Sequence, residues 1–388
     1  MYLICDSCGT TFTEQERLWQ CPCGGCLSFL EDRKGTFDKI HIASGPGNMW
    51  RYSEMLPLKE GLHPVSMGEG LTPLVKTDWS GKEVWFKLDF LCPTGSYKDR
   101  GMSFQISKLK ELGIERVIED SSGNAGSSMA AYCARAGITC DIYVPSYTSP
   151  GKCVQIEMYG SHLHKIPGTR EDTTRAAIEA SGDVYYASHN WSPYFVHGVK
   201  TFAFEIWEQL GWRAPDNLVV PAGQGSLVMG ACLGFRELQH AGRIEKIPRI
   251  FAVQAKGCAP LYEAFIRGMN RPVEIQKEET IAEGISSAEP VRGDRVIREV
   301  AESGGSFLVV DDIRIWRSLS DLCRKGFYVE PTSAVVGPAL DELFRSGKVA
   351  QEELTVALLS GSGLKATEKI MKYRDHWGYP ALIPGTGS

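Results

Sequence analysis

The stretch Pro93-Thr-Gly-Ser-Tyr-Lys98-Asp-Arg-Gly101 organises this sequence. An apolar, strand-like run at residues 84–88 precedes it, and apolar residues at helical spacing follow it, namely Met102, Ile106 and Leu109. We therefore expect Lys98 where a turn enters a helix. Backbone N–H dipoles at such a position lower the pKa of a lysine, and a lysine that loses its proton easily can form a Schiff base with an aldehyde. Taken alone, the same lysine would be read as a solvated surface residue beside Asp99 and Arg100.

Composition sets the broad class of protein. The 388 residues are 43% hydrophobic and 23% charged, which predicts a soluble globular chain of two or three domains. A formal net charge of -5 without a long basic run argues against nucleic acid and anionic membranes as partners. No stretch approaches the roughly 18 apolar residues of a membrane span, and the N-terminus lacks the layout of a signal peptide. We expect a cytoplasmic protein.

Five of the twelve cysteines lie within the first 26 residues: Cys5, Cys8, Cys21, Cys23 and Cys26. Four thiolates at this spacing suit a tetrahedral zinc ion, which would be structural because a closed site leaves no position for substrate. The second pair of ligands could be Cys21 with Cys23, or Cys23 with Cys26. A disulfide pair and a zinc site lost in evolution are the alternatives.

Strand-like and helix-like runs alternate through the middle of the chain. Strands are expected at residues 116–120, 140–144 and 161–166, and helices at residues 130–136 and 154–159. This alternation predicts parallel sheets covered by helices.

Three further motifs each follow a predicted strand. Ser121-Ser-Gly-Asn-Ala-Gly126 opens a helix, and its small residues let backbone N–H groups converge on an anion. Gly223 and Gly225, in Pro221-Ala-Gly-Gln-Gly-Ser, let the backbone approach a phosphate, but no Gly-Lys-Ser/Thr follows as in a Walker loop. The third is Ser360-Gly-Ser-Gly-Leu-Lys365.

These motifs resemble those of threonine synthases, in the tryptophan synthase β-like group of pyridoxal phosphate (PLP) enzymes. The segment around Lys98 is similar to the cofactor-lysine motif, although the family usually has Phe at the position of Tyr97. Three more segments are similar to the family's "GEGxTPL", "KTxAFEI" and "EPxSA", at residues 68–74, 200–206 and 330–334. Many threonine synthases also open with a zinc-ribbon-like segment.

The resemblance implies a role for each motif. Lys98 would carry PLP as a Schiff base and then act as the general base at Cα. Asn124 would hydrogen-bond the phenolic oxygen of PLP, and Ser360 would hold the pyridine nitrogen without protonating it. The substrate carboxylate would bind the loop Ser121, Ser122, Gly123, Asn124 and Ala125, and the cofactor phosphate the loop Gly223, Gln224, Gly225, Ser226 and Leu227.

The implied architecture is the α/β, tryptophan synthase β-like PLP fold type II, with parallel or mixed sheets and a cofactor cleft between two domains. Residues 93–190 would form the small domain, and residues 45–90 with 191–388 the large one. Residues 1–30 would form the zinc-ribbon-like unit. The family is often dimeric, but nothing in the sequence decides whether this chain forms a homodimer.

Two departures concern the substrate. Where threonine synthases commonly read "NPxRxEGQKT", this chain has Ser192-Pro-Tyr-Phe195-Val-His197-Gly-Val-Lys-Thr, so the family's arginine falls on Phe195. That arginine is suited to gripping the phosphate of O-phosphohomoserine. The family's "TAIRIG" segment is replaced by Ile281-Ala-Glu283-Gly-Ile, which is closer to the "DGI" segment of serine and threonine dehydratases. Glu283 would then line the pocket, or else lie on the surface.

Three functions therefore compete. The first is threonine synthase itself, acting on O-phosphohomoserine. The second is elimination or replacement at Cβ or Cγ of another small amino acid, as in a dehydratase, a diaminopropionate ammonia-lyase or a cysteate synthase-like enzyme. The third is a non-catalytic relative that binds ligand. Lys365, Arg100 or His197 could compensate for the missing arginine, since each lies near a cofactor motif in the sequence.

Overall fold

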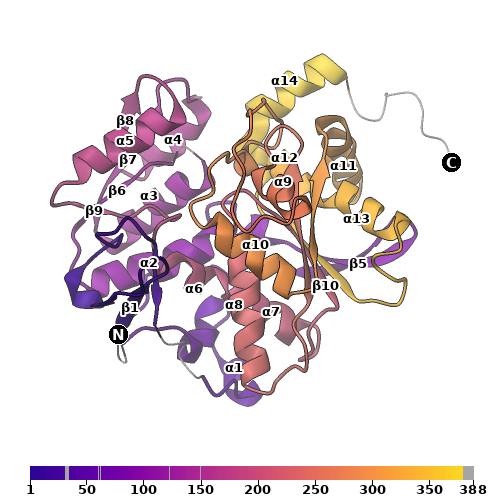
Figure 1. Ribbon diagram of the computed structural model, residues 1–388, viewed down its shortest axis with the longest axis horizontal. Coiled ribbons are helices and arrows are strands. Elements are labelled where there is room, and N and C mark those ends of the chain that lie inside the picture. Colours follow the sequence, from indigo (N-terminus) through magenta and orange to yellow (C-terminus); the bar gives the residue numbers. More distant parts are fainter. Residues whose placement is uncertain (31–34, 60, 62, 122, 149, 379–388) are drawn as a thin grey trace. The chain divides into compact units, whose positions relative to one another are not determined.

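The structure is a computed structural model that describes residues 1–30, 35–59, 61, 63–121, 123–148 and 150–378 (Figure 1). The chain divides into two compact units. The first unit comprises Met1–Thr72, Cys92–Arg213 and Met229–Lys246, and the second comprises Pro73–Leu91, Ala214–Val228 and Ile247–Ser388.

The first unit begins with a small antiparallel sheet of strand order β2-β1-β3. Its strands are β1 (Tyr2–Cys5), β2 (Thr11–Thr13) and β3 (Leu27–Phe29), with the short 3-10 helix η1 (Glu14–Glu16) after β2. This small sheet has a hydrophobic core of its own, which consists of Leu3, Cys5, Cys21 and Leu27.

A four-stranded parallel sheet of order β8-β7-β6-β9 follows in the same unit. Its strands are β6 (Arg116–Glu119), β7 (Thr139–Pro145), β8 (His162–Ile166) and β9 (Tyr185–Tyr186). The helices between and before them are α2 (Lys98–Glu111), α3 (Asn124–Ala136), α4 (Pro150–Met158) and α5 (Arg170–Ser181). The predicted alternation is confirmed, although α3 and α4 begin several residues earlier than the apolar pattern indicated.

The remaining helices of the first unit are α1 (Lys39–Ser44), η2 (Met49–Met55), α6 (Phe195–Val199) and α7 (Thr201–Gln209). Helix α6 packs on α2, and α1 and α7 contact η2. Helix α6 approaches α2 so closely that a Cβ added to Gly198 would lie 2.1 Å from the carbonyl oxygen of Arg100. Only glycine fits there, which brings Phe195 next to the first turn of α2.

The second unit is built on a six-stranded mixed sheet of order β12-β11-β10-β13-β5-β4. Its strands are β4 (Leu74–Trp79), β5 (Lys82–Lys87), β10 (Asn217–Pro221), β11 (Arg249–Ala255), β12 (Ser306–Val310) and β13 (Thr355–Leu358), and only the β4–β5 pair is antiparallel. The α-helices are α8 (Ser226–His240), whose later part belongs to the first unit, α9 (Pro260–Ile266), α10 (Gly293–Glu302), α11 (Asp312–Arg324), α12 (Pro331–Ala334), α13 (Val336–Arg345) and α14 (Thr367–Trp377). Short 3-10 helices are η3 (Asp89–Leu91), η4 (Glu283–Ile285) and η5 (Gly363–Ala366).

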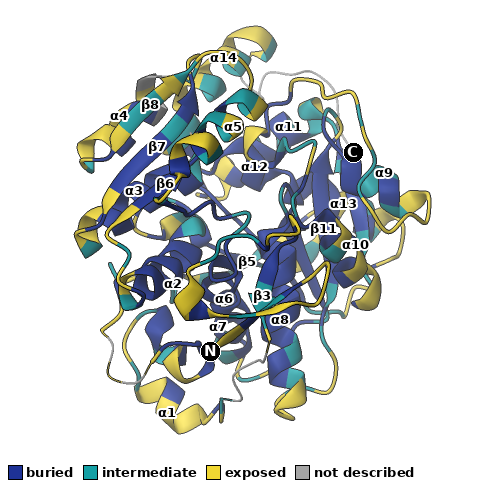
Figure 2. Ribbon diagram, turned by 60° about the vertical axis from the view of Figure 1, so that its left-hand side comes forward, coloured by how far each residue is buried: buried dark blue, intermediate teal, exposed yellow. Residues whose placement is uncertain are grey.

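The sheets are buried, as parallel strands covered by helices must be. Leu218, Val219 and Val220 of β10 are wholly buried, and Figure 2 shows strands β6, β7 and β11 mostly dark blue while α1 and α14 are largely exposed. Among the described residues, no helix has the length and apolar character that crossing a membrane requires. The predicted α/β architecture with parallel and mixed sheets is confirmed.

Candidate active site

Lys98 is the first residue of α2, as the turn-to-helix pattern predicted. Its side chain is half-buried beside two aromatic rings. The Nζ lies 4.9 Å from the ring centroid of Tyr97 and 5.2 Å from that of Phe195, whose side chain is fully buried. Phe195 therefore forms an apolar wall next to the lysine amine.

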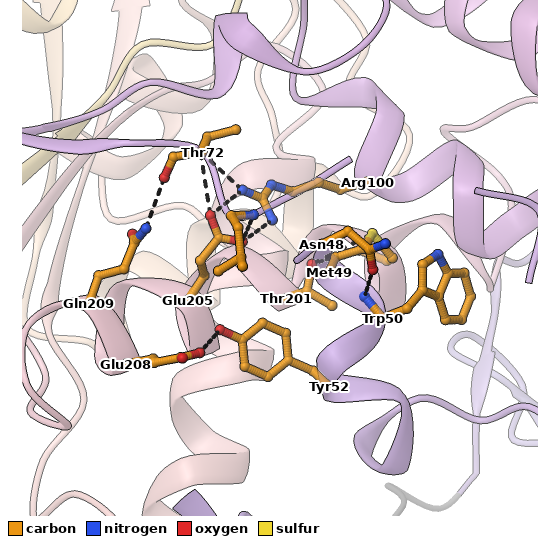
Figure 3. Close-up of polar contacts among 12 residues, drawn as sticks. Asn48, Met49, Trp50, Tyr52, Thr72, Arg100, Thr201, Glu205, Glu208 and Gln209 are labelled. Atoms are coloured by element: carbon orange, nitrogen blue, oxygen red, sulfur yellow. Dashed lines mark hydrogen bonds and ion pairs between the residues drawn. The ribbon is translucent and has the colours of Figure 1, made fainter. Parts of the chain in front are cut away.

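The neighbours of Lys98 are buried and bonded, so the interpretation of this segment as a solvated surface is wrong. Both terminal nitrogens of Arg100 donate to the carboxylate of Glu205, at 2.8 and 3.0 Å, and neither side chain is exposed. Nη2 of Arg100 also donates to the hydroxyl of Thr72 at 3.3 Å (Figure 3). This explains two of the motifs, because Thr72 lies in the "GEGxTPL" segment and Glu205 in the "KTxAFEI" segment.

The Ser121–Gly126 motif forms the loop between β6 and α3. A Cβ on Gly126 would lie 1.8 Å from the carbonyl oxygen of Ser121, so the loop can close only on glycine. Asn124 is the first residue of α3, and nothing lies within 4 Å of a Cβ placed on Gly123. Backbone N–H groups at the start of this helix can therefore meet an anion. Ser122 lies outside the described residues.

The second glycine-rich loop joins β10 to α8. Gly225 has φ +84°, a left-handed conformation that favours glycine. The Gln224 amide bonds within the second unit: its Nε2 donates to the Ser287 hydroxyl at 2.7 Å, and its Oε1 accepts from the Val291 N–H at 2.9 Å. The side chain of Gln224 thus braces the loop, and the backbone N–H groups at the start of α8 are of the kind that can meet an anion.

Ser360 follows β13 and is buried. Its hydroxyl lies 3.0 Å from the hydroxyl of Ser333, and the Ser333 oxygen also accepts from the backbone N–H groups of Ser360 and Gly361, both at 2.9 Å. Ser333 belongs to the "EPxSA" segment, so the structure gives that segment the task of orienting Ser360. Sequence reasoning noted the segment but not this contact.

A buried acid–imidazole pair escaped the sequence analysis. Glu119, at the end of β6, accepts from the backbone N–H of His189 at 3.1 Å, and its Oε1 lies 3.2 Å from the ring Nδ1. Burial, helped by Asp120, raises the pKa of Glu119 to about 8, and burial together with the charge of Lys98 lowers the pKa of His189 well below its usual value. The His189 ring packs edge-on to Phe195 with ring centroids 5.3 Å apart. Glu119 ends an ordinary strand-like run, which carries no signal of this pairing.

Three other residues that the sequence analysis named contact other parts of the protein. Ser192 is buried, and its hydroxyl accepts from the backbone N–H of Tyr194 at 3.1 Å. His197 packs against the rings of Phe29 and Phe104. Glu283 lies 2.9 Å from the Nζ of Lys369 in a partly exposed ion pair.

The N-terminal cysteines converge. The sulfurs of Cys5, Cys8, Cys21 and Cys23 all lie within 4.8 Å of one another, and Cys26 is not a member of this group. The Thr10 hydroxyl beside Cys8 lowers the pKa of that thiol to about 6, whereas burial and the neighbouring thiols raise the pKa of Cys21 and of Cys23. Four sulfurs at this separation fit the donor set of a structural zinc ion.

The described residues include chemical groups of the kinds that can hold PLP. An amine (Lys98) and an amide (Asn124) lie at helix starts in the first unit, and a glycine-rich loop before a helix and a buried hydroxyl (Ser360) lie in the second.

Comparison with known proteins agrees with this chemistry. The sequence profile of the pyridoxal-phosphate dependent enzymes matches residues 65–361, so the chain belongs to that family. The threonine synthase of Methanocaldococcus jannaschii is 34% identical over 93% of this chain and 92% of its own length. That of Mycobacterium tuberculosis is 33% identical over 84% of this chain and 91% of its own length.

Solved structures support the same fold. Maize serine racemase superimposes with a TM-score of 0.66 at 22% identity, over 78% of this chain and 92% of its own. Threonine deaminase isoform 2 from Solanum lycopersicum gives 0.65 at 21% identity, over 78% and 83%. The protein is a PLP-dependent lyase of the threonine synthase-like group.

Proposed function

We propose that this enzyme removes or replaces a group at Cβ or Cγ of a small amino acid, and that it uses O-phosphohomoserine less well than another amino acid with such a leaving group. The observation that carries the proposal is the position of Phe195. This residue stands where the family's phosphate-gripping arginine is expected, and its buried ring lies 5.2 Å from the Nζ of Lys98. An apolar ring cannot donate a hydrogen bond to a phosphate. A charge-assisted contact of the kind it replaces contributes roughly 1.5–3 kcal/mol.

Arg100, Lys200 and His197 do not restore the lost contact. Arg100 is held by both oxygens of Glu205, and Lys200 lies 2.5 Å from the Glu237 carboxylate, with both cations fully buried. His197 is enclosed by aromatic rings. If either cation left its ion pair to reach a ligand, a buried carboxylate would remain without its partner. The loss of free energy would exceed the gain from one phosphate contact.

The chain's own residues divide the work as follows. Lys98 holds the cofactor aldehyde, and its amine, once released by substrate, takes the Cα proton. The loop from Ser121 to Ala125 receives the substrate carboxylate, and Asn124 the phenolic oxygen. The loop from Gly223 to Leu227 holds the cofactor phosphate, and Ser360 hydrogen-bonds the ring nitrogen as a neutral partner. The bound cofactor supplies the electron sink for the charge that develops at Cα.

A second candidate is threonine synthase activity itself. The relatives compared above carry that name and align over most of this chain. If O-phosphohomoserine is the substrate, its phosphate must be held by groups other than Arg100, Lys200 and residue 195.

A substrate screen separates the two. Holoenzyme is mixed with serine, threonine, O-phosphoserine, 2,3-diaminopropionate and O-phosphohomoserine, and the visible absorbance of the cofactor and product formation are followed. We expect kcat/KM for one of the unphosphorylated amino acids to exceed that for O-phosphohomoserine. Saturable threonine formation from micromolar O-phosphohomoserine would establish the second candidate. The role of Lys98 in holding the cofactor is tested by Lys98→Ala, which should abolish both the visible absorbance band and turnover.

We also propose that Cys5, Cys8, Cys21 and Cys23 bind one structural zinc ion. The convergence of their four sulfurs supports this set over one that includes Cys26. Because the site would be closed, the metal takes no part in the reaction.

Domain layout and cellular setting complete the proposal. We assign residues 93–190 to a small domain, residues 45–90 and 191–388 to a large one, and residues 1–30 to a zinc-ribbon-like unit. The four-stranded sheet falls inside the first assignment and the six-stranded sheet inside the second, which supports it, whereas residues 45–72 and 191–213 belong to the same compact unit as the small domain. We also propose a cytoplasmic homodimer, as the family is often dimeric, and no nucleic-acid partner, which the net charge of -5 supports. Light scattering of the purified enzyme tests the dimer.

A further inference from the structure

Helices α2 and α3 carry the two groups of the first unit that would touch the cofactor. Helix α2 begins at Lys98 and α3 at Asn124, and the two helices pack side by side (Figure 1). The separation of these helices therefore fixes the separation of Lys98 from Asn124. Two buried carboxylates, Asp99 and Glu69, bond to this pair of helices.

Asp99 joins the first turn of α2 to α3. Its Oδ1 accepts from the hydroxyls of Thr94 and Ser128, both at 2.6 Å, and its Oδ2 accepts from the backbone N–H of Thr94 at 2.7 Å. Asp99 and Ser128 are fully buried. Since Asp99 follows Lys98 directly, the bond to Ser128 fixes the helix start that carries the lysine.

Glu69 makes the second connection. Its Oε1 accepts from the hydroxyl of Ser103 on α2 at 2.5 Å and from the indole N–H of Trp50 at 2.9 Å. Its Oε2 accepts from the hydroxyl of Tyr132 on α3 at 2.7 Å and from the backbone N–H of Met67 at 2.9 Å. This carboxylate is wholly buried and all four donors are neutral.

Such carboxylates tolerate little movement. A buried acceptor that loses a donor keeps its desolvation penalty, so the network is most stable when every donor is in place. Burial, with the charges of Asp99 and Glu69, raises the pKa of Tyr132 well above its usual value, so its hydroxyl remains a donor. Sliding α3 along α2 would break the Ser128 and Tyr132 bonds together.

We propose that Asp99 and Glu69 are positioning residues that set the distance between the cofactor's lysine and its asparagine, acting through Ser128 and Tyr132. The proposal rests on the roles given above to Lys98 and Asn124. It assigns the glutamate of the "GEGxTPL" segment a function that needs no contact with substrate.

The test removes the hydroxyls on α3 and leaves Lys98, Asn124 and both carboxylates in place. The variants are Ser128→Ala and Tyr132→Phe. The matched control is Ser107→Ala, which removes an equally internal hydroxyl of α2 that bonds Val65 and Ser103. Cofactor affinity is measured by diluting the holoenzyme and following its visible absorbance, together with the wavelength of the absorbance maximum and the unfolding midpoint.

We expect cofactor affinity to fall about five- to tenfold in Ser128→Ala and in Tyr132→Phe, with a shifted absorbance maximum. Ser107→Ala should lose stability to a similar degree while its affinity stays within about twofold and its spectrum is unchanged. The proposal is overturned if all three variants lose stability alike and none changes the affinity or the spectrum. If Lys98 does not hold the cofactor, the visible band will persist in Lys98→Ala, and this result is separate from the outcome of the Ser128 and Tyr132 variants. Because Ser128 bonds Asp99 and Tyr132 bonds Glu69, Tyr132→Phe keeps the test valid if Ser128→Ala fails to fold.

Discussion

Phe195 packs on Gly101 so tightly that a Cβ added to the glycine would lie 2.3 Å from Cε2 of the ring. Gly101 is three residues after Lys98 on the same helix, so the contact fixes the ring against the first turn of α2. The apolar wall beside the lysine amine is thus built into the packing of α6 on α2.

The first prediction concerns this wall. Phe195→Arg places a guanidinium where the related threonine synthases are expected to have one. O-phosphohomoserine should then bind about ten- to hundredfold more tightly, because a charge-assisted bond to its phosphate becomes available. Spectral titration of the holoenzyme measures the affinity. Phe195→Leu, which keeps the site apolar, is the control and should show no gain. Equal affinity in all three proteins would mean that residue 195 does not face the substrate.

The second prediction concerns the buried ion pair of Arg100 and Glu205. Arg100→Leu leaves the Glu205 carboxylate buried without its cation and should lower the free energy of unfolding by about 3–5 kcal/mol. Arg175→Leu is the control, since its pair with Asp172 is exposed and should be worth less than about 1 kcal/mol. Denaturant unfolding compares the two. Similar small losses would show that Glu205 finds other partners.

The features that the sequence predicts correctly are those that depend on short stretches of residues. Periodicity and turn residues within such stretches predict the helix start at Lys98 and the alternation of strands and helices that gives parallel sheets. The beginning of α3 was placed too late because Asn124, Gly126 and two serines hide the helical pattern behind residues typical of a loop.

Contacts between distant residues could not be predicted in this way. Arg100 and Glu205 are 105 residues apart, and Glu119 and His189 are 70 apart. Nothing in either local segment marks its partner. Resemblance to a family indicated which segments matter, but their tasks, such as Ser333 holding Ser360, emerged only from the fold.

The third prediction is a metal content of about one zinc per chain in protein purified without chelator. Cys23→Ser should lower that content and destabilise the antiparallel N-terminal unit, whose core is small. Cys323→Ser, a change at an exposed cysteine far along the chain, should alter neither. Elemental analysis and thermal unfolding measure the two effects. Full zinc content in Cys23→Ser would favour a set containing Cys26, and zinc-free protein with disulfides found by mass spectrometry would exclude the site.

The last prediction concerns pH. In the native protein Glu119 has a pKa raised to about 8, whereas its ordinary value is 4.5. Between these values the native state holds a proton that the unfolded chain has lost, so raising the pH favours unfolding. His189 acts in the opposite sense, because its pKa is lowered well below 6.5 and the unfolded chain gains a proton as the pH falls through that value. The charged groups around the pair are Lys98, Asp120 and Arg170.

From about pH 6.5 to 8 His189 no longer opposes Glu119, and comparison with Glu119→Gln separates Glu119 from other groups that titrate there, such as Cys8. Wild-type protein should lose stability relative to Glu119→Gln across this window, by at most about 1.4 kcal/mol per pH unit. Denaturant unfolding of the cofactor-free proteins at several pH values gives the difference. Glu115→Gln removes an exposed carboxylate just before the same strand and should run parallel to wild type. If the difference in unfolding free energy between wild type and Glu119→Gln does not change from pH 6.5 to 8, Glu119 is already ionised in the native state. The buried pair of Glu119 and His189 then carries a negative charge.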